Sequence, residues 1–171
     1  MRYILLKVAF TIALVLAAPA ASAGDVRITV YGERSGNGSL MIGLYDTAAG
    51  FEEAIRRSTE AGLLNDPLRV AGVALRAAAG VQAIVLGGLK PGRYAVITFH
   101  DENNDGKLGS TPWGVPTEGY GFSNDAHGFL QAPSFDAAAF EVTGSGTTAT
   151  ISLMYPQPLS QPDLSADHFR D

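Results

Sequence analysis

The segment 100–125 holds the residues whose types and spacing are best suited to chemistry. Oxygen-bearing side chains recur there at every second position, namely Asp101, Asn103 and Asp105. Gly106 follows them and permits a sharp turn, after which the backbone carbonyl of Lys107 would face inward. This is the first half of an EF-hand-type calcium loop, so the spacing predicts a calcium site within 101–108.

The predicted loop is incomplete as a calcium site. It offers four oxygen ligands, whereas calcium takes six to eight. Pro112 stands where an EF-hand has its bidentate glutamate, and Gly109 stands where a further carboxylate would help. The missing ligands would come from water or from other carboxylates, and the candidates are Glu102, Glu118 and Asp125. The alternative is a turn without metal, because Asp, Asn and Gly are common turn residues.

The second half of the segment, 113–122, combines glycines with aromatic residues, including the only tryptophan of the chain. The rings are Trp113, Tyr120 and Phe122. One interpretation is a rigid aromatic platform that binds a carbohydrate or a peptide. The other is that these rings cap one end of the fold and bind nothing.

Catalytic chemistry has fewer candidates. Asp101 and Glu118 would be the carboxylate pair of a hydrolase acting on glycosides, and His100 with His127 would hold zinc beside a carboxylate. Neither pair has the spacing of a known motif, and the chain contains no GxSxG or HExxH sequence. We therefore expect no catalytic residues and keep the hydrolase using Asp101 and Glu118 as an alternative.

Composition restricts the partners and the compartment. The 171 residues include 12 Lys and Arg against 17 Asp and Glu, which gives a formal net charge of -5, and there is no cysteine. An acidic chain is a poor match for nucleic acid, which needs a basic surface. Residues 1–23 resemble a secretory signal, because Arg2 and Lys7 precede an apolar run that ends in the cleavage-type sequence Ala-Ser-Ala. We expect a periplasmic or secreted protein with no stable membrane insertion after cleavage.

Strand signals dominate the region after the signal segment. Alternating or continuous apolar runs predict seven strands, at 26–31, 40–45, 68–77, 81–86, 94–99, 135–142 and 147–155. The segment 51–64 predicts one short helix after the second strand, and the prolines beyond 155 predict a flexible tail over 156–171. These elements indicate an all-β protein, an antiparallel Greek-key β-sandwich formed by a single domain at 24–155.

A local motif supports the sandwich prediction. Pro91 and Gly92 are the central pair of a type II turn, and Tyr94 begins the strand that follows. This is the arrangement of a tyrosine corner, in which the hydroxyl binds backbone a few residues upstream. Pro91, Gly92 and Tyr94 are therefore expected to be structural residues, as is Gly106.

The runs YAVITFHDENNDGKLG, WGVPTEGYGFSND and PSFDAAAF resemble the DUF2141 proteins, exported bacterial proteins of unknown function. The resemblance covers most of the chain and is strongest over 92–125. It implies no catalytic residue. The family pattern has an acidic residue where this chain has Gly109, which counts against calcium here. More loosely, the turn and strand pattern is similar to transthyretin-like and carboxypeptidase-regulatory-like domains.

Together these patterns favour an exported, non-enzymatic β-sandwich module that is stabilised by calcium in the 101–108 loop and that acts through an unknown protein or glycan partner. A carbohydrate- or peptide-binding accessory protein that uses the 113–122 loop is the alternative.

Overall fold

The computed structural model describes residues 22–128 and 131–156. The predicted signal segment 1–23 and the predicted tail 156–171 lie almost entirely outside the described residues. Within the described ranges, no helix is long and apolar enough to cross a membrane.

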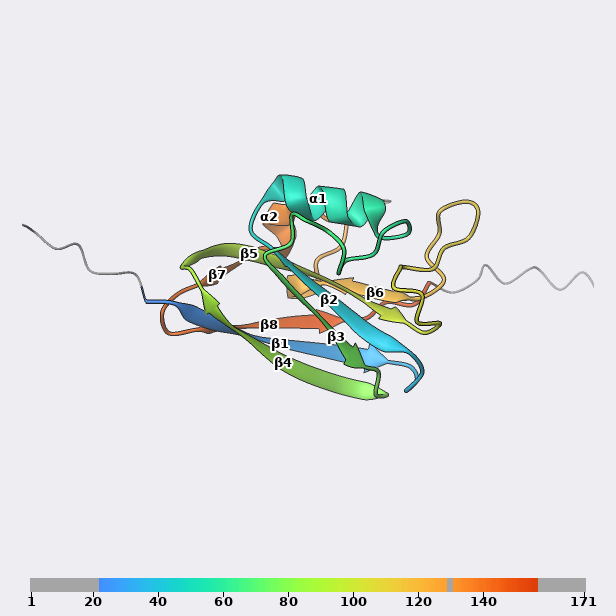
Figure 1. Cartoon of the computed structure of the whole chain (residues 1–171), viewed down its shortest axis with the longest axis horizontal. Coiled ribbons are helices and arrows are strands. Elements are labelled where there is room, and N and C mark those ends of the chain that lie inside the picture. The colour runs from blue at the N-terminus through green and yellow to red at the C-terminus, as the bar shows by residue number, and fades with distance from the viewer. Residues whose placement is uncertain (1–21, 129–130, 157–171) are drawn as a thin grey trace, which may run out of the picture.

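The protein is mostly β (Figure 1). The strands are β1 (Gly24–Glu33), β2 (Ser39–Tyr45), β3 (Ala71–Arg76), β4 (Gly80–Leu89), β5 (Gly92–Asp101), β6 (Gly119–Phe122), β7 (Phe140–Val142) and β8 (Thr147–Ser152). The helices are α1 (Ala48–Arg57), the 3-10 turn η1 (Ser123–Asp125) and α2 (Phe135–Ala138).

The strands form two sheets. One has the order β4-β1-β8, and the other has the order β3-β2-β5-β6 with β7 also paired to β5. All the pairs between strands are antiparallel except β1 with β8, which are parallel. The predicted all-antiparallel pairing is therefore wrong for this pair. The turn before β8 lies against Gly24, because a Cβ atom added at Gly24 would meet the carbonyl of Thr143. Both β1 and β8 therefore start at the same end of the sheet.

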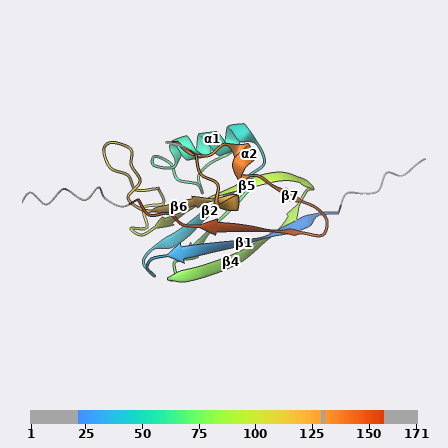
Figure 2. The same cartoon turned by 180° about the vertical axis from the view of Figure 1, so that it is seen from behind.

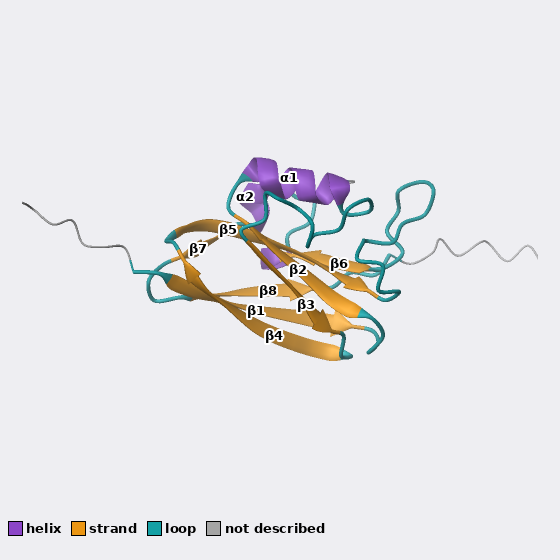
Figure 3. Ribbon diagram, viewed as in Figure 1, coloured by secondary structure: helices purple, strands orange, loops and turns teal. Residues whose placement is uncertain are grey.

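Two hydrophobic clusters lie on the two faces of the larger sheet. The first joins inward side chains of both sheets, with Val26, Ile28 and Val30 of β1 almost fully buried. The second lies between the larger sheet and α1 and α2, which cover its other face (Figures 2 and 3). This explains why β5 is apolar on both faces, as its sequence indicated.

The helices differ from the sequence prediction for local reasons. Helix α1 begins at Ala48 because Thr47 caps it, its hydroxyl oxygen accepting a hydrogen bond of 3.2 Å from Gly50 N. It ends at Arg57, so the predicted helical residues 58–64 form turns instead. The predicted strand 135–142 is split: Ser134 caps α2 by accepting from Ala137 N, and only the end of the segment pairs as β7. The strand β6 lies where the sequence predicted only loop.

Candidate functional site

The loop after β5 is organised by Asp101. This side chain is only 2% exposed. Its Oδ1 accepts a hydrogen bond of 3.1 Å from Asp105 N, and its Oδ2 accepts one of 2.8 Å from Gly106 N. Gly106 has a φ of 79°, the left-handed conformation that favours glycine. One buried carboxylate thus closes the turn through backbone amides.

The other predicted ligands lie in the same turn. Asn103 Oδ1 accepts a hydrogen bond of 3.0 Å from Asp105 N, and Asp105 Oδ1 accepts one of 2.9 Å from Lys107 N. Asn103 Nδ2 also donates to Asp105 Oδ2 at 3.0 Å. The structure therefore brings Asp101, Asn103, Asp105 and Lys107 into one compact loop whose side-chain oxygens bind backbone N–H groups.

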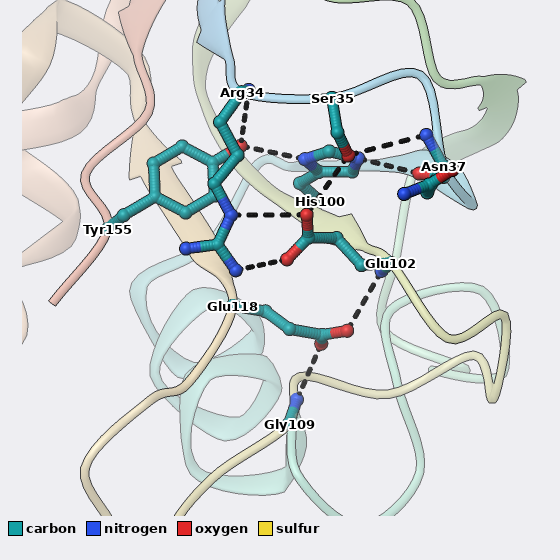
Figure 4. Close-up of polar contacts among 8 residues, drawn as sticks. All are labelled: Arg34, Ser35, Asn37, His100, Glu102, Gly109, Glu118 and Tyr155. Carbon is teal, nitrogen blue, oxygen red and sulfur yellow. Dashed lines mark hydrogen bonds and ion pairs between the residues drawn. The ribbon is translucent and has the colours of Figure 1, made fainter. Parts of the chain in front are cut away.

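Glu118 directly precedes β6, and its side chain reaches the loop from there (Figure 4). It is 6% exposed, and its two oxygens bind two separate points of the chain. Oε1 accepts from Glu102 N and Oε2 accepts from Gly109 N, both at 2.8 Å. Glu118 therefore clamps the two ends of the loop, because one oxygen binds Glu102 N and the other binds Gly109 N. These are the same two oxygens that the sequence assigned to a metal or to catalysis.

The clamp also accounts for Gly109. A Cβ at this position would lie 2.9 Å from Thr117 Oγ1 and 3.1 Å from Glu118 Oε2. These distances are tighter than ordinary contacts, so the acidic residue that the family pattern has here does not fit beside Glu118 without a shift.

The remaining predicted ligands have other contacts. Asp125 Oδ1 accepts a hydrogen bond of 2.6 Å from Ser152 N. Glu102 pairs with Arg34, through Arg34 Nε to Oε1 at 3.1 Å and a second contact from Nη2 to Oε2. Across residues 22–128 and 131–156, no group of three or more His, Cys, Asp or Glu side chains is placed to share a metal ion.

The Arg34–Glu102 pair changes the titration of both groups. The hydrogen bond from Arg34 lowers the pKa of Glu102 below its ordinary 4.5, and a further bond from Ser35 Oγ acts in the same direction. The bond to Glu102 also raises the pKa of Arg34. The pair joins the loop to the segment after β1.

His100 is fully buried beside this pair and has a defined tautomer (Figure 4). Its Nε2 lies 2.8 Å from the Asn37 carbonyl, which can only accept, so Nε2 carries the proton. Its Nδ1 lies 2.7 Å from the Tyr155 hydroxyl, which accepts from Arg34 N at 3.2 Å and so donates to Nδ1. The Arg34 guanidinium lies 4.4 Å from the centre of the Tyr155 ring.

His100 therefore ties the C-terminal segment to the β1–β2 connection. Burial raises the pKa of Tyr155, which keeps its hydroxyl a donor. His127, the other predicted zinc ligand, is exposed, and its Nδ1 lies 3.1 Å from the Asp125 carbonyl. The sequence did not identify Arg34 or Tyr155 as a site residue, because neither belongs to a local motif; it placed Tyr155 only at the end of the last predicted strand.

Tyr94 lies at the opposite end of β5. It is 5% exposed, and its hydroxyl donates a hydrogen bond of 2.9 Å to the Lys90 carbonyl, immediately before Pro91 and Gly92. Burial raises the pKa of this phenol. This geometry is that of a tyrosine corner and is structural.

A pocket of about 630 Å³ lies beneath the C-terminal half of α1. Its floor is the outer face of β5 and β6, and its walls are the end of α1, the 108–116 segment and the residues on either side of 129–130. Apolar residues that line it include Ile55, Ile97, Phe99, Leu108, Val115 and Phe122. This volume and this lining are typical of ligand sites.

Trp113 is 90% exposed and does not itself line this pocket. A tight turn presents it, since Gly114 N donates to the Thr111 carbonyl at 2.9 Å and Thr111 N donates to the Val115 carbonyl at 2.8 Å. Gly114 and Val115, which follow it, line the pocket. Of the three predicted platform rings only Trp113 is exposed, whereas Tyr120 is half-buried and Phe122 is buried.

The fold and the site together define a two-sheet, mostly β protein with a carboxylate-closed loop and an adjoining apolar pocket. The chain belongs to the family described as "Uncharacterized protein conserved in bacteria (DUF2141)", whose family model matches residues 28–150. This confirms the resemblance seen in the sequence. No curated protein and no solved structure matches the chain.

Proposed function

We propose that this protein is an exported, non-enzymatic binding module that holds an apolar peptide side chain in the pocket beside Trp113. The observation that carries the proposal is the pairing of an apolar pocket with a tryptophan that is 90% exposed. Exposed apolar surface that is continuous with a pocket marks interaction sites, and tryptophan is enriched among the residues that carry binding energy.

The lining favours a peptide over a carbohydrate. Two of its hydroxyl groups already bind the protein backbone, Ser58 to the Ile55 carbonyl at 2.9 Å and Thr98 to the Met41 carbonyl at 2.8 Å. The floor around Ile97, Phe99 and Phe122 is apolar. A sugar needs many hydrogen bonds when it leaves water, whereas an aliphatic or aromatic side chain needs none.

The hydrolase alternative has weaker support. Asp101 and Glu118 each use both oxygens to accept backbone N–H groups, so neither carboxylate is free to transfer a proton or attack a substrate.

The binding test uses Trp113 as its own reporter, because it is the only tryptophan in the chain. Its fluorescence is titrated with a library of short peptides carrying Leu, Phe or Val and, in parallel, with chitotetraose and maltoheptaose. We expect saturable changes with the apolar peptides and none with the sugars. Saturation with the sugars alone would instead assign the site to a carbohydrate, and no response to either class would refute the proposal.

A matched pair of variants locates the site. Val115 lines the pocket and is 50% exposed, so Val115→Glu places a charge at the pocket without disturbing the core. Thr117 is exposed on the same segment and does not line the pocket. Val115→Glu should weaken peptide binding about tenfold or more, the cost of burying an unpaired charge, while Thr117→Glu should leave it unchanged.

We also propose that the loop binds calcium weakly, through Asp101, Asn103, Asp105 and the Lys107 carbonyl, with water completing the coordination. The supporting observation is a buried carboxylate, Asp101, that pairs with no Lys or Arg side chain in the described part of the chain. Glu118 is the further ligand that the sequence predicted, and like Asp101 it accepts backbone N–H groups with both oxygens. Either carboxylate would bind calcium through its remaining lone pairs.

The calcium test is a thermal melt in calcium and in chelator. A site with a Kd of about 1 mM, assayed at about 5 mM calcium, raises the free energy of unfolding by about 1 kcal/mol, or about 3 °C. Asp105→Ala should abolish the shift. An equal shift in the variant or with magnesium would indicate a diffuse acidic patch, and no shift in the wild type would indicate a bare turn.

Two further proposals concern processing and topology. The signal-like residues 1–23 support export, which predicts a mature protein that begins at Gly24, as intact mass would test. The shared core of the two sheets and the tyrosine-corner geometry at Tyr94 support a β-sandwich with Greek-key connections.

A further inference from the structure

The two long sides of the double sheet differ in how they are closed. On one side, β8 and β6 approach each other, with Tyr120 N donating to the Met154 carbonyl at 3.0 Å and Met154 N donating back at 2.8 Å. Asp125 covers the edge of β8 there by accepting from Ser152 N at 2.6 Å. That side therefore has few backbone groups free to pair with another strand.

The other side is formed by β3 and β4, each of which pairs with one strand only among the described residues. Edge strands are normally protected by charges, prolines or bulges, because their free N–H and C=O groups pair readily with another chain. β3 has such protection: Arg76 ends it, and the Arg69 side chain lies against Gly72, where a Cβ would be 2.4 Å from Arg69 Cδ.

β4 has only part of this protection, because its register against β1 shifts at both ends but stays regular from Val81 to Leu86. Its sequence, GVQAIVLGGL, contains no charged residue and no proline. Its one polar side chain, Gln82, is occupied within the molecule, since Nε2 donates to Glu33 Oε1 at 2.8 Å and to the Arg76 carbonyl at 3.1 Å. Val81 is 57% exposed and Val85 is 50% exposed on its outer face.

The core-facing side of β4 is also incompletely covered. Ile84 and Leu86 pack against the central cluster but remain half-buried, whereas Ile28 on the neighbouring strand β1 is fully buried. Another strand beside β4 would cover these side chains and pair the free backbone edge, where β4 lies at the margin of its sheet (Figures 1 and 2).

We infer that β4 is the dimerisation edge of this protein and that its occupant is β4 of a second copy, added antiparallel to make one continuous six-stranded sheet. Charge favours this occupant. Two copies of a chain with a net charge of -5 repel each other where their carboxylates come close. β4 has ten residues and no carboxylate, so two copies can meet along it without this repulsion.

Symmetry also fits. Two identical antiparallel strands are related by a two-fold axis, so the interface is self-complementary. With the axis at Ala83, Val81 lies opposite Val85 of the partner subunit, and the same pair recurs across the axis. The outer faces of both copies then stay on one side of the sheet, because opposite residues in antiparallel strands point the same way.

The test is the molar mass of the purified full chain, measured by sedimentation equilibrium over a wide range of concentrations. The wild type should have twice the mass of one chain. Val81→Glu with Val85→Glu places like charges opposite each other and should raise the dimer dissociation constant at least about tenfold. Val81→Lys with Val85→Glu places opposite charges there and should retain the dimer.

The controls separate this pairing from general effects of charge. Both double variants change the same two exposed positions, so both should keep the wild-type circular dichroism spectrum. Thr150→Glu adds a carboxylate to an exposed position of β8, on the same sheet but away from β4, and should leave the dimer intact. A wild type that is monomeric at every concentration overturns the inference, as does equal dissociation of the two double variants.

Discussion

The role of Glu118 as a clamp can be tested by removing its carboxylate. Glu118→Ala leaves the backbone N–H groups of Glu102 and Gly109 without their acceptor. A hydrogen bond to a charged group contributes about 1.5–3 kcal/mol. The lower end of this range applies here, because Glu118→Ala also removes the free-energy cost of burying the carboxylate away from water. Two such bonds give an expected loss of about 3 kcal/mol, or roughly 10 °C in Tm for a domain of this size.

Glu118→Gln is a sharper perturbation because it preserves the shape. The amide keeps one accepting oxygen but turns an NH2 group towards the second N–H, so one bond is lost and two donors face each other. We expect a loss of about 2 kcal/mol, smaller than that of the alanine variant.

Urea unfolding in the presence of chelator, followed by circular dichroism, measures both variants. The midpoints should fall while the slope m stays constant, since the surface exposed on unfolding hardly changes. Glu60→Ala, at an exposed position, should change the free energy of unfolding by less than about 0.5 kcal/mol. The clamp reasoning is refuted if Glu118→Ala is as stable as this control, or if its loss occurs only when calcium is present.

Three further predictions follow from single contacts. Tyr94→Phe removes the hydrogen bond to the Lys90 carbonyl and should cost about 1 kcal/mol in urea unfolding; an unchanged midpoint would contradict the corner. Because Arg34 lowers the pKa of Glu102, the pair stabilises the fold above the ordinary pKa of 4.5, and this contribution is lost as the pH falls below it. Glu102→Gln should therefore be less stable than wild type at pH 7, by no more than about 1 kcal/mol for so exposed a pair, and this difference should shrink as the pH falls through the lowered pKa of Glu102. Gly62→Ala should unfold at much lower urea or fail to fold, because Gly62 has a φ of 67° and its Cβ would meet the Gly106 carbonyl; near-wild-type stability would show that the two loops do not touch.

Local patterns in the sequence determined the elements of the fold and their faces. The alternation of Val26, Ile28 and Val30 with polar residues identified β1 and its buried face, because side chains of a strand alternate between two sides. The apolar residues on both faces of β5 likewise indicated a strand covered twice. The spacing of Asp101, Asn103, Asp105 and Gly106 identified a tight turn, because its contacts span only two to five residues.

Competition between local signals explains the misplaced elements. The segment 135–142 is rich in residues that suit either a helix or a strand, and the cap at Ser134 decided for a short helix. The segment 119–122 has two glycines, which weaken any strand signal, yet it pairs as β6. Its strand conformation comes from the neighbouring β5, against which Phe122 pairs with Ile97.

Only the tertiary structure decided which distant residues form the site. Glu118 lies 16 residues from the amide it binds at Glu102, and Arg34 lies 68 residues from its partner carboxylate. The pocket combines α1 with β5, β6 and two further segments. Backbone geometry makes side-chain directions repeat every few residues, so the strands and helices can be recognised from the sequence pattern. Contacts between remote segments depend on where whole strands and helices pack, which no short pattern encodes, so the clamp, the ion pair and the open edge of β4 emerged only once both sheets were in place.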